Sequence, residues 1–432
     1  MDVARTYGSY VGQALEKNPD RANALIRLGL HAESFRTGHF PDSQSPKAHQ
    51  YLRHMAMKEV ADVLGKPEQF AWTNIFAPVE ILQCFDIKCI SMECLASYLS
   101  GFWIEDRLID ACETAGFAST MCSYHKTFIG ACEAGLVPKP LCGITTSTIC
   151  DCNTNTFRYL RKHDALPTRL IDIPHEWSPE GEEYVVAQLR ETISWLEGLS
   201  GRRFDEERLK QTLVRENESK AHYLSFLEKR RTHAYPEALI MRLFMLFATH
   251  LSIGSEWALE FFKTLDAEVD AQPLDASKRL FWVHIVPYAE PTLNEYLNYN
   301  EELTVVADDF NLDFVEQLDV EQLDVERPLH ALARKMICNI YNGDFSRKVD
   351  AVSRYVQHYD CDGVVEFCHW GCKQSCGGVQ LLKRQMSELG VPMLALDGDA
   401  IDRRSGQEGQ AKTRFEAFLE LLDATREGRS CA

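Results

Sequence analysis

Two stretches of the sequence alternate between short apolar segments and amphipathic segments, and a long helical stretch separates them. The strand-like runs are 70–78, 87–92, 141–148 and 169–174 in the first stretch, and 279–287, 303–309, 362–367 and 391–399 in the second. Strands that are separated by helices pair in parallel through βαβ units. The alternation therefore predicts an α/β fold with two parallel-sheet domains.

The length of the chain supports more than one core. At 432 residues it exceeds the size at which a single hydrophobic core stops growing. Apolar residues recur at helical spacing before residue 65 and again between about 180 and 275. We predict a helical segment at 1–65, an α/β domain at 66–180, a helical segment at 181–277 and an α/β domain at 278–432.

The charge and hydropathy of the chain exclude several partners. A net charge of −18 repels nucleic acid and anionic membrane surfaces. The most apolar stretch, which starts at Ala238, is interrupted by Arg242, His250 and Glu256, so it predicts a buried helix and not a membrane span. The first residues lack the pattern of a signal peptide. We expect a cytoplasmic protein with no nucleic-acid partner and no membrane partner.

The cysteines are unevenly distributed. There are 15, of which nine lie from Cys84 to Cys152, four lie from Cys361 to Cys376, and none lies between Cys152 and Cys338. An odd number in a chain without a secretion signal argues against a disulfide framework. The cysteines inside apolar runs are expected to be packing thiols: Cys84, Cys89, Cys94, Cys112, Cys132, Cys142, Cys338 and Cys361.

Three cysteines lie at predicted helix starts. Cys150 and Cys372 each follow a predicted strand and precede a helix, in equivalent places of the two α/β domains, and Cys122 opens another helix. A helix N-terminus favours a thiolate, and open α/β sheets bind ligands at the carboxyl ends of their strands. One site in a cleft between the two domains would unite them. The pattern alone supports a metal ligand and a buried thiol equally at these positions.

The type of metal site is also constrained by spacing. Thiolates bind iron–sulfur clusters, whereas structural zinc sites use paired CxxC knuckles, and this chain has no CxxC. The neighbouring Cys152, Cys368 and Cys376 can coordinate, adjust the site or only pack. His125 and His369 lie near the candidates, but isolated histidines are most often side chains without a ligand role.

Nucleotide-binding loops are absent from the sequence. It contains no GxxxxGK[ST] motif and no GxGxxG after a strand. We therefore expect any ATP hydrolysis that this system needs to occur on another protein.

Several segments together resemble a known family. They are "APVEILQCF", "MCSYHKTFIGACEAGLVPKP", "TTSTICDCNTNTFRYL", "HWGCKQSCGGVQLLK" and "PMLALDGDAIDRRSGQEGQAKTRFEAFLELL". From about residue 70 to 425 the chain is similar to the D-component family of 2-hydroxyacyl-CoA dehydratases. The resemblance implies Rossmann-like domains around a [4Fe–4S] cluster. It places the ligands at Cys122 in "CSYHK", Cys150 in "TICD" and Cys372 in "WGCKQ".

The resemblance also implies a reaction. In this family a separate ATP-hydrolysing activator injects one electron, and the cluster passes it to the thioester carbonyl of an acyl-CoA. The resulting ketyl radical expels the hydroxyl group, and loss of a proton with return of the electron gives an enoyl-CoA. A homologous partner subunit or a homodimer is expected. Glu80, in "PVE", resembles a recurrent acid near the substrate and is the predicted proton carrier; the alternative is a solvated acid at a helix start.

Other functions stay open at this point. The same resemblance covers benzoyl-CoA reductase subunits and double-cubane ATP-dependent reductases, and a non-catalytic electron-relay subunit is a further alternative. A double cubane needs more cysteines at strand ends of the C-terminal half, and "WVHIVP" and "TVVADD" contain none. We therefore predict a single [4Fe–4S] cluster.

Overall fold

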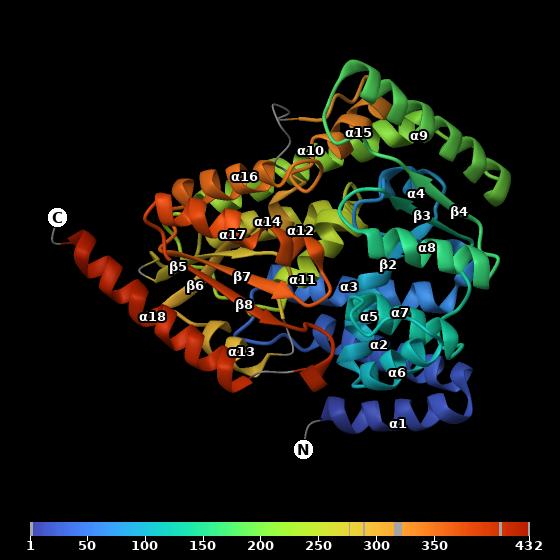
Figure 1. Cartoon of the computed structure of the whole chain (residues 1–432). Coiled ribbons are helices and arrows are strands. Elements are labelled where there is room, and N and C mark those ends of the chain that lie inside the picture. The colour runs from blue at the N-terminus through green and yellow to red at the C-terminus, as the bar shows by residue number, and fades with distance from the viewer. Residues whose placement is uncertain (1–2, 276, 288–289, 315–321, 406–407, 431–432) are drawn as a thin grey trace.

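Two parallel β-sheets form the framework of the molecule (Figure 1). The computed structural model describes residues 3–275, 277–287, 290–314, 322–405 and 408–430. The first sheet has the strand order β2-β1-β3-β4 and the second has the order β6-β5-β7-β8. All pairings within them are parallel. The predicted α/β fold with two Rossmann-like domains, a helical N-terminal segment and a helical middle segment is confirmed.

In the N-terminal half, three long helices come before the first sheet, and further helices connect its strands. Its helices are α1 (Val3–Lys17), α2 (Pro19–His39), α3 (Lys47–Gly65), η1 (Pro67–Gln69), α4 (Val79–Cys84), α5 (Met92–Gly101), α6 (Glu105–Thr114), α7 (Ser123–Glu133) and α8 (Asp151–His163). Its strands are β1 (Phe70–Thr73), β2 (Lys88–Ser91), β3 (Cys142–Thr146) and β4 (Thr168–Ile171). The predicted strand at 70–78 is shorter than expected, because the chain turns at Asn74, whose carbonyl accepts the Ala77 N–H.

The middle segment is helical and leads into the second sheet. The middle helices are α9 (Pro179–Ser200), α10 (Glu206–Lys229), α11 (Met241–Leu246), the π-helical turn η2 (Phe247–Leu251) and α12 (Glu256–Val269). The second sheet has β5 (Lys278–Val283), β6 (Leu303–Asp308), β7 (Gly363–His369) and β8 (Met393–Gly398). Its helices are α13 (Pro291–Leu297), α14 (Asp309–Leu312), α15 (Pro328–Ile337), α16 (Phe345–His358), α17 (Lys373–Glu388), η3 (Arg403–Ser405) and α18 (Glu408–Ser430).

Helices cover both faces of the second sheet. Figure 1 shows α16 and α17 on one side of it and α13 and α18 on the other. The last helix packs through Phe415, Phe418 and Leu422, which are all buried. Each such side chain contributes about 1.5–3 kcal/mol relative to an exposed one. The helix at the end of the chain is therefore part of the second domain's core.

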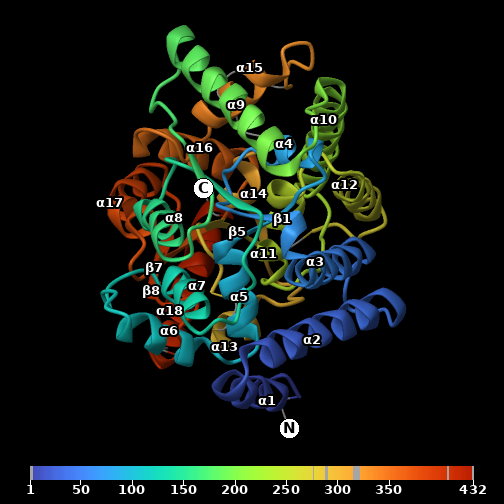
Figure 2. The ribbon, with the colours of Figure 1, turned by 90° about the vertical axis from the view of Figure 1, so that its right-hand side faces the viewer.

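The two helical segments pack at different places. Helices α9, α10 and α15 lie at one end of the molecule, and α1 and α2 lie at the opposite end (Figures 1 and 2). Between them, α3 of the N-terminal segment packs on α12 of the middle segment. The proposed boundaries after residues 65, 180 and 277 stay predictions. In the described ranges no helix is long and apolar enough to cross a membrane.

Both sheets have the same topology, and this places the site. In each, the second strand lies on one side of the first and the third strand lies on the other side. The order thus reverses between β1 and β3 and between β5 and β7. Open α/β sheets bind ligands just outside the carboxyl ends of the strands at such a reversal. The residues that follow these four strands are therefore the ones to inspect.

Candidate functional site

One large cavity meets the carboxyl ends of both sheets. Its volume is about 1420 Å³, more than the roughly 300–1,000 Å³ of a common ligand pocket. Asn74 after β1, Cys150 after β3, His284 after β5 and Cys372 after β7 all line it. The cavity therefore lies at the reversal points of two sheets at once, as a cleft shared by both domains.

The three predicted ligand cysteines all line this cavity. Cys122, Cys150 and Cys372 are the N-cap residues of α7, α8 and α17. The predicted helix starts are thus confirmed. The Cys150 Sγ accepts the Asn153 N–H at 3.4 Å, as a capping side chain does. Each sulfur lies at the positive end of a helix dipole, which favours negative charge there.

A glycine brings the two halves of the site into contact. Gly371, directly before Cys372, has φ +79°, a conformation that favours glycine. A Cβ at this position would lie 2.7 Å from the Cys122 nitrogen and 2.9 Å from the Cys122 Cα. The turn after β7 therefore rests directly on the backbone of Cys122, from the other domain.

Two other turn residues beside the site have unusual backbone conformations. Ile149, before Cys150, has φ +74°, and His284 has φ +71°. A non-glycine residue in this region costs about 1–3 kcal/mol and is found mainly where the surrounding structure imposes it. The turns after β3 and β5 are therefore held in place at an energetic cost, as at many functional sites.

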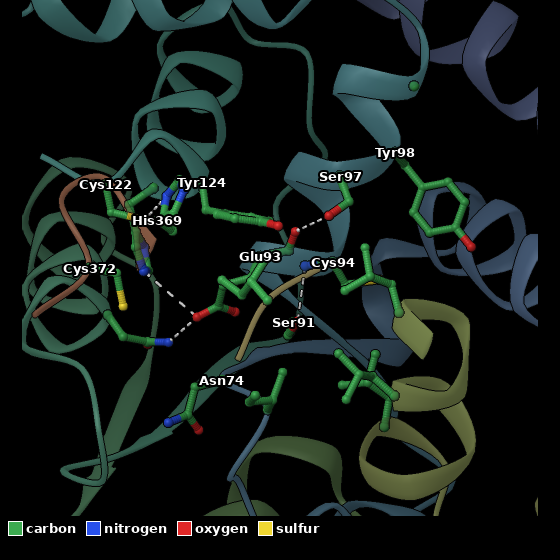
Figure 3. Close-up of a pocket in the computed structure, with 18 of the residues that line it drawn as sticks. Asn74, Ser91, Glu93, Cys94, Ser97, Tyr98, Cys122, Tyr124, His369 and Cys372 are labelled. Carbon is green, nitrogen blue, oxygen red and sulfur yellow. Dashed lines mark hydrogen bonds and ion pairs between the residues drawn. The ribbon is translucent and has the colours of Figure 1, made fainter. Parts of the chain in front are cut away.

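Each of the three thiols faces an imidazole. The Sγ–Nε2 distances are 3.3 Å for Cys122 and His369, 3.9 Å for Cys150 and His125, and 3.7 Å for Cys372 and His284. Figure 3 shows Cys122, Cys372 and His369 on the same side of the cavity. The first pair joins the two domains, the second lies within the first domain, and the third lies within the second domain.

The histidines are neutral. Burial lowers the pKa of all three, and that of His125 falls to about 4. In His369 the Nδ1 accepts the Ala400 N–H at 3.1 Å, so the proton of the neutral ring is on Nε2. His369 thus donates an N–H to the Cys122 sulfur.

His125 has the opposite tautomer. The Thr156 hydroxyl donates to the Cys152 carbonyl at 2.9 Å, so its oxygen accepts from His125 Nδ1 at 3.0 Å. The ring proton is therefore on Nδ1, and Nε2 faces the Cys150 sulfur as an acceptor.

The donor set fits a metal cluster. Burial, and then the nearby thiols, raise the pKa of Cys122 well above 9; burial also raises that of Cys150. In the described ranges the hydrogen-bond partners of these sulfurs are imidazoles and a backbone N–H, with no lysine or arginine among them, and the facing imidazoles are neutral. A bound metal removes the protons from coordinating thiols outright and supplies the missing positive charge. Thiols of this kind are suited to metal binding and poorly suited to act as nucleophiles.

The spacing of the donors is wider than a single ion needs. Among the residues that the structure describes, no three His, Cys, Asp or Glu side chains converge closely enough to hold one metal ion. In an iron–sulfur cluster each thiolate binds a different iron, so the sulfurs lie farther apart. Three thiols around a shared cavity are compatible with the larger group.

The other cysteines of these segments divide into two groups. Cys152 lines the cavity, and burial raises its pKa to about 12. Cys368 is buried in β7 and Cys376 is exposed in the first turn of α17, and neither lines the cavity. Cys152 is thus an additional thiol in the cavity wall, and so is Cys94, which the sequence predicts to be a packing thiol. All cysteines in the described ranges are free.

Glu93 is a cavity carboxyl group that the sequence alone did not single out. It follows β2 in the first turn of α5 and lies in the cavity, between Cys372 and Tyr98 in the view of Figure 3. Its Oε1 accepts from Asn153 Nδ2 at 2.6 Å and lies 3.7 Å from His125 Nε2. Burial raises its pKa to about 7. A carboxyl group that is half protonated near neutral pH can give or take a proton.

Several buried polar atoms on the cavity wall have no hydrogen-bond partner within the described part of the chain. They are Asn74 Oδ1, Glu93 Oε2, Tyr98 Oη and His284 Nδ1. Buried polar atoms are nearly always paired, so this group indicates a ligand or bound water as the partner. His284 and Glu93 carry a sequence signal only in hindsight: each directly follows, or nearly follows, a strand end.

Glu80 lies outside the large cavity. It begins α4 as predicted, but it is buried, and Lys335 Nζ donates to Glu80 at 2.6 Å and to Glu216 at 2.6 Å. The alternative of a solvated acid is therefore wrong. Glu80 borders a small neighbouring cavity of about 40 Å³, which shares Ile75 and Phe76 with the large one. Its role as a proton carrier stays a prediction.

Comparisons with known proteins show which family the chain belongs to. A profile of the family described as 2-hydroxyglutaryl-CoA dehydratase, D-component, matches residues 74–422. The chain is 24% identical to the (R)-phenyllactyl-CoA dehydratase alpha subunit of Clostridium sporogenes, over 88% of this chain and 97% of that protein. It is 23% identical to the lactoyl-CoA dehydratase subunit alpha of Anaerotignum propionicum, over 88% and 98%.

A reductase subunit is similarly related. One subunit of the benzoyl-CoA reductase of Thauera aromatica is 23% identical, over 82% of this chain and 88% of that protein. The match to the family profile spans most of the chain and includes strands β2 to β8 and the three predicted ligand cysteines. The chain therefore belongs to the 2-hydroxyglutaryl-CoA dehydratase D-component family.

Proposed function

We propose that this chain is the iron–sulfur subunit of a 2-hydroxyacyl-CoA dehydratase. Cys122, Cys150 and Cys372 would hold a [4Fe–4S] cluster, and a separate ATP-dependent activator would supply one electron. The observation that carries the proposal is the meeting of three thiols at helix N-cap positions, from both domains, on one cavity of substrate size. The names of the relatives supply the substrate class.

The overall reaction is redox-neutral. It removes the hydroxyl group from C2 of the acyl chain and a proton from C3, and it releases an enoyl-CoA and water. When bound, the cluster would supply a transferable electron and an iron with an open position for the thioester carbonyl. With three protein thiolates, one of the four irons has no protein ligand.

The chain's own residues hold the reacting group and control protons. The His369 N–H directed at Cys122 stabilises negative charge on that sulfur. Apolar side chains around the cavity exclude water, which strengthens the electrostatic interactions within it. Glu93, with its pKa raised to about 7 by burial, is placed to donate a proton to the leaving hydroxyl or to accept one from C3.

Two carboxyl groups compete for the role of proton carrier. Glu80 is the acid that the resemblance indicates, but its carboxylate is paired with Lys335 beyond the wall formed by Ile75 and Phe76. Glu93 lines the cavity itself. If Glu93 carries the proton, Glu93→Gln lowers kcat strongly with little change in KM, whereas Glu80→Gln affects mainly thermal stability. The reverse result would assign the role to Glu80.

Further protein partners are part of the proposal. The dehydratase relatives are named as alpha subunits, and the reductase relative is also named as one subunit of its enzyme. We therefore propose that this chain works with a second subunit, either homologous or identical, in addition to the activator.

The direct test is turnover. The anaerobically purified protein is combined with its partner subunit, activator, ATP and a reductant, and 2-hydroxyacyl-CoA thioesters are added. We expect an enoyl-CoA product by mass spectrometry, dependent on ATP in catalytic amounts. Absence of product with an occupied cluster and an active activator would contradict the proposal.

A second candidate is a reductase of the benzoyl-CoA type, which the similarity to the Thauera aromatica protein favours. Such an enzyme consumes two electrons for each substrate reduced, whereas the dehydratase returns its electron. The ratio of ATP and reductant consumed to product formed separates the two: a stoichiometric ratio with an aromatic thioester would support the reductase.

A further inference from the structure

We propose that the cavity selects an apolar acyl group, aromatic or branched, and excludes acyl groups that end in a carboxylate. This inference rests on the proposed function and makes its substrate class specific. The juxtaposition that carries it is an apolar helix face on the cavity, with Glu93 as the inner charged group and the two rim cations, Arg36 and Lys373, each paired with an acid.

The apolar wall comes from one face of a helix. The cavity is lined by Ile240 at the N-cap of α11, by Leu243 and Phe244 within α11, and by Phe247 at the start of η2. Their spacing of i, i+3, i+4 and i+7 places them on one side of the helix. This is the stretch that the sequence predicts to be a buried helix. Part of its apolar face lines a cavity.

Tyr98 extends this wall from the opposite element, α5. Its ring packs edge-to-face with two phenylalanine rings. The ring centroids are 6.3 Å apart with an interplanar angle of 89° for Phe244, and 6.1 Å apart with an angle of 80° for Phe247. Figure 3 shows Tyr98 on the far side of Glu93 from Cys372. Edge-to-face aromatic surfaces of this kind accept another ring or a branched alkyl group.

The charges around the cavity disfavour a carboxylate. Arg36 donates two hydrogen bonds to Glu33, both at 2.7 Å, and its side chain is 50% exposed. Lys373 lies 3.4 Å from Asp151, and its side chain is 89% exposed. Both cations are thus at the solvent side and already have acidic partners.

Inside the cavity an acyl carboxylate would meet Glu93. It would lose its hydration without gaining a positive partner, and it would repel the carboxylate form of Glu93. A phenyl or branched alkyl group gains free energy when it leaves water for the same wall. Both effects favour an apolar acyl group over one that ends in a carboxylate.

Binding of saturated thioesters tests this inference without turnover. Titration calorimetry on the anaerobically purified protein compares 3-phenylpropionyl-CoA, 4-methylpentanoyl-CoA, glutaryl-CoA and CoA itself, none of which can be dehydrated. We expect the first two to bind at least about tenfold more tightly than glutaryl-CoA. Equal or tighter binding of glutaryl-CoA would overturn the inference and leave the proposed function intact. If no thioester binds, the proposed function fails and the inference fails with it.

A charge added to the wall provides a second readout. Leu243→Lys places an ammonium group in the cavity lining, and Leu243→Met is the matched control. The lysine variant should bind glutaryl-CoA more tightly and 3-phenylpropionyl-CoA more weakly, and the control should keep the original order. An unchanged ratio in a folded lysine variant contradicts the inference. If that variant does not fold, Phe247→Ala should weaken 3-phenylpropionyl-CoA about fivefold or more and leave CoA unchanged; equal weakening of both contradicts it.

Discussion

At the scale of single residues, the tautomer of each histidine determines what it does for its sulfur. His369 offers an N–H to Cys122, because its other nitrogen accepts the Ala400 N–H. His125 offers Cys150 a lone pair, because its ring proton is on Nδ1, where it is donated in a hydrogen bond to the Thr156 oxygen. Hydrogen bonds to cluster sulfurs raise the reduction potential. The two imidazoles therefore have unequal effects although they look alike in the sequence.

Replacing these histidines one at a time tests the assignment. His369→Phe removes an N–H···S hydrogen bond, so it should lower the reduction potential of the proposed cluster, because the reduced state loses a stabilising donor. His125→Phe, the comparison variant, removes no such donor and should change the potential less. Redox titration followed by electron paramagnetic resonance measures both. Equal shifts in the two variants would show that the tautomers are assigned wrongly.

Glu366 gives a second residue-scale test, away from the cavity. It is fully buried in β7, neither of its carboxyl oxygens has a hydrogen-bond partner in the described ranges, and burial raises its pKa to about 7. The unfolded chain releases this proton near pH 4.5 and the folded chain near pH 7. The contribution of protonated Glu366 to the free energy of unfolding is therefore fully present below about pH 4.5, and it is lost as the pH rises through 7.

Glu366→Gln should therefore gain stability over wild type as the pH rises. The gain between pH 5 and pH 8 is at most about 3 kcal/mol, because the pKa of Glu366 rises from 4.5 to about 7 on folding and each unit corresponds to about 1.4 kcal/mol. Thermal unfolding at the two pH values measures it as a difference in Tm between variant and wild type. A difference that is the same at both pH values would show that Glu366 does not titrate in this range.

At the scale of elements, the turns after the strands build the site. The helix starts at Cys150 and Cys372 were predictable, because a strand followed by a helix fixes where the N-cap falls, and the start near Cys122 was predictable from the helical pattern that follows it. The histidine pairs were not. His284 meets Cys372 only because β5 and β7 are neighbours in the sheet, and His369 meets Cys122 only because two domains touch. Such pairings depend on tertiary packing, which a single sequence does not display.

The same limit explains Glu80. The sequence correctly puts it at the start of a helix, but Lys335, its partner in the fold, is 255 positions away. A short motif cannot reveal a partner that far along the chain. Glu93 was overlooked for a related reason, since nothing near it in the sequence indicates that the turn after β2 borders the cavity.

The turn at Gly371 provides an element-scale prediction. A methyl group there would lie 2.7 Å from the Cys122 nitrogen, and the alanine backbone would have to adopt the left-handed conformation that Gly371 has. Gly371→Ala should therefore separate Cys372 from Cys122 and reduce bound iron several-fold while the helices persist. Iron analysis and circular dichroism check both parts. Gly377→Ala is the control, because nothing lies within 4 Å of its added Cβ and it sits in α17, where alanine favours the helix. Full iron content in Gly371→Ala would contradict this role of the turn.

At the scale of the whole molecule, two sheets with the same strand order face one cavity. Each contributes its order-reversal point, so neither domain alone contains the three thiols: Cys122 and Cys150 come from the first and Cys372 from the second. A shared site of this kind couples cofactor binding to the relative position of the domains. The parallel fold itself was predictable from the sequence, since eight strand-like runs alternate with helices.

The central claim is that these three thiols hold one cluster, and its most direct measurement is the iron and acid-labile sulfide content of the anaerobically purified protein. We expect about four of each per chain in wild type. Cys122→Ala, Cys150→Ala and Cys372→Ala should each lose most of both, together with the brown absorbance. Cys338→Ala, which removes a buried thiol away from the cavity, should retain them. Full iron and sulfide in Cys372→Ala would contradict the account.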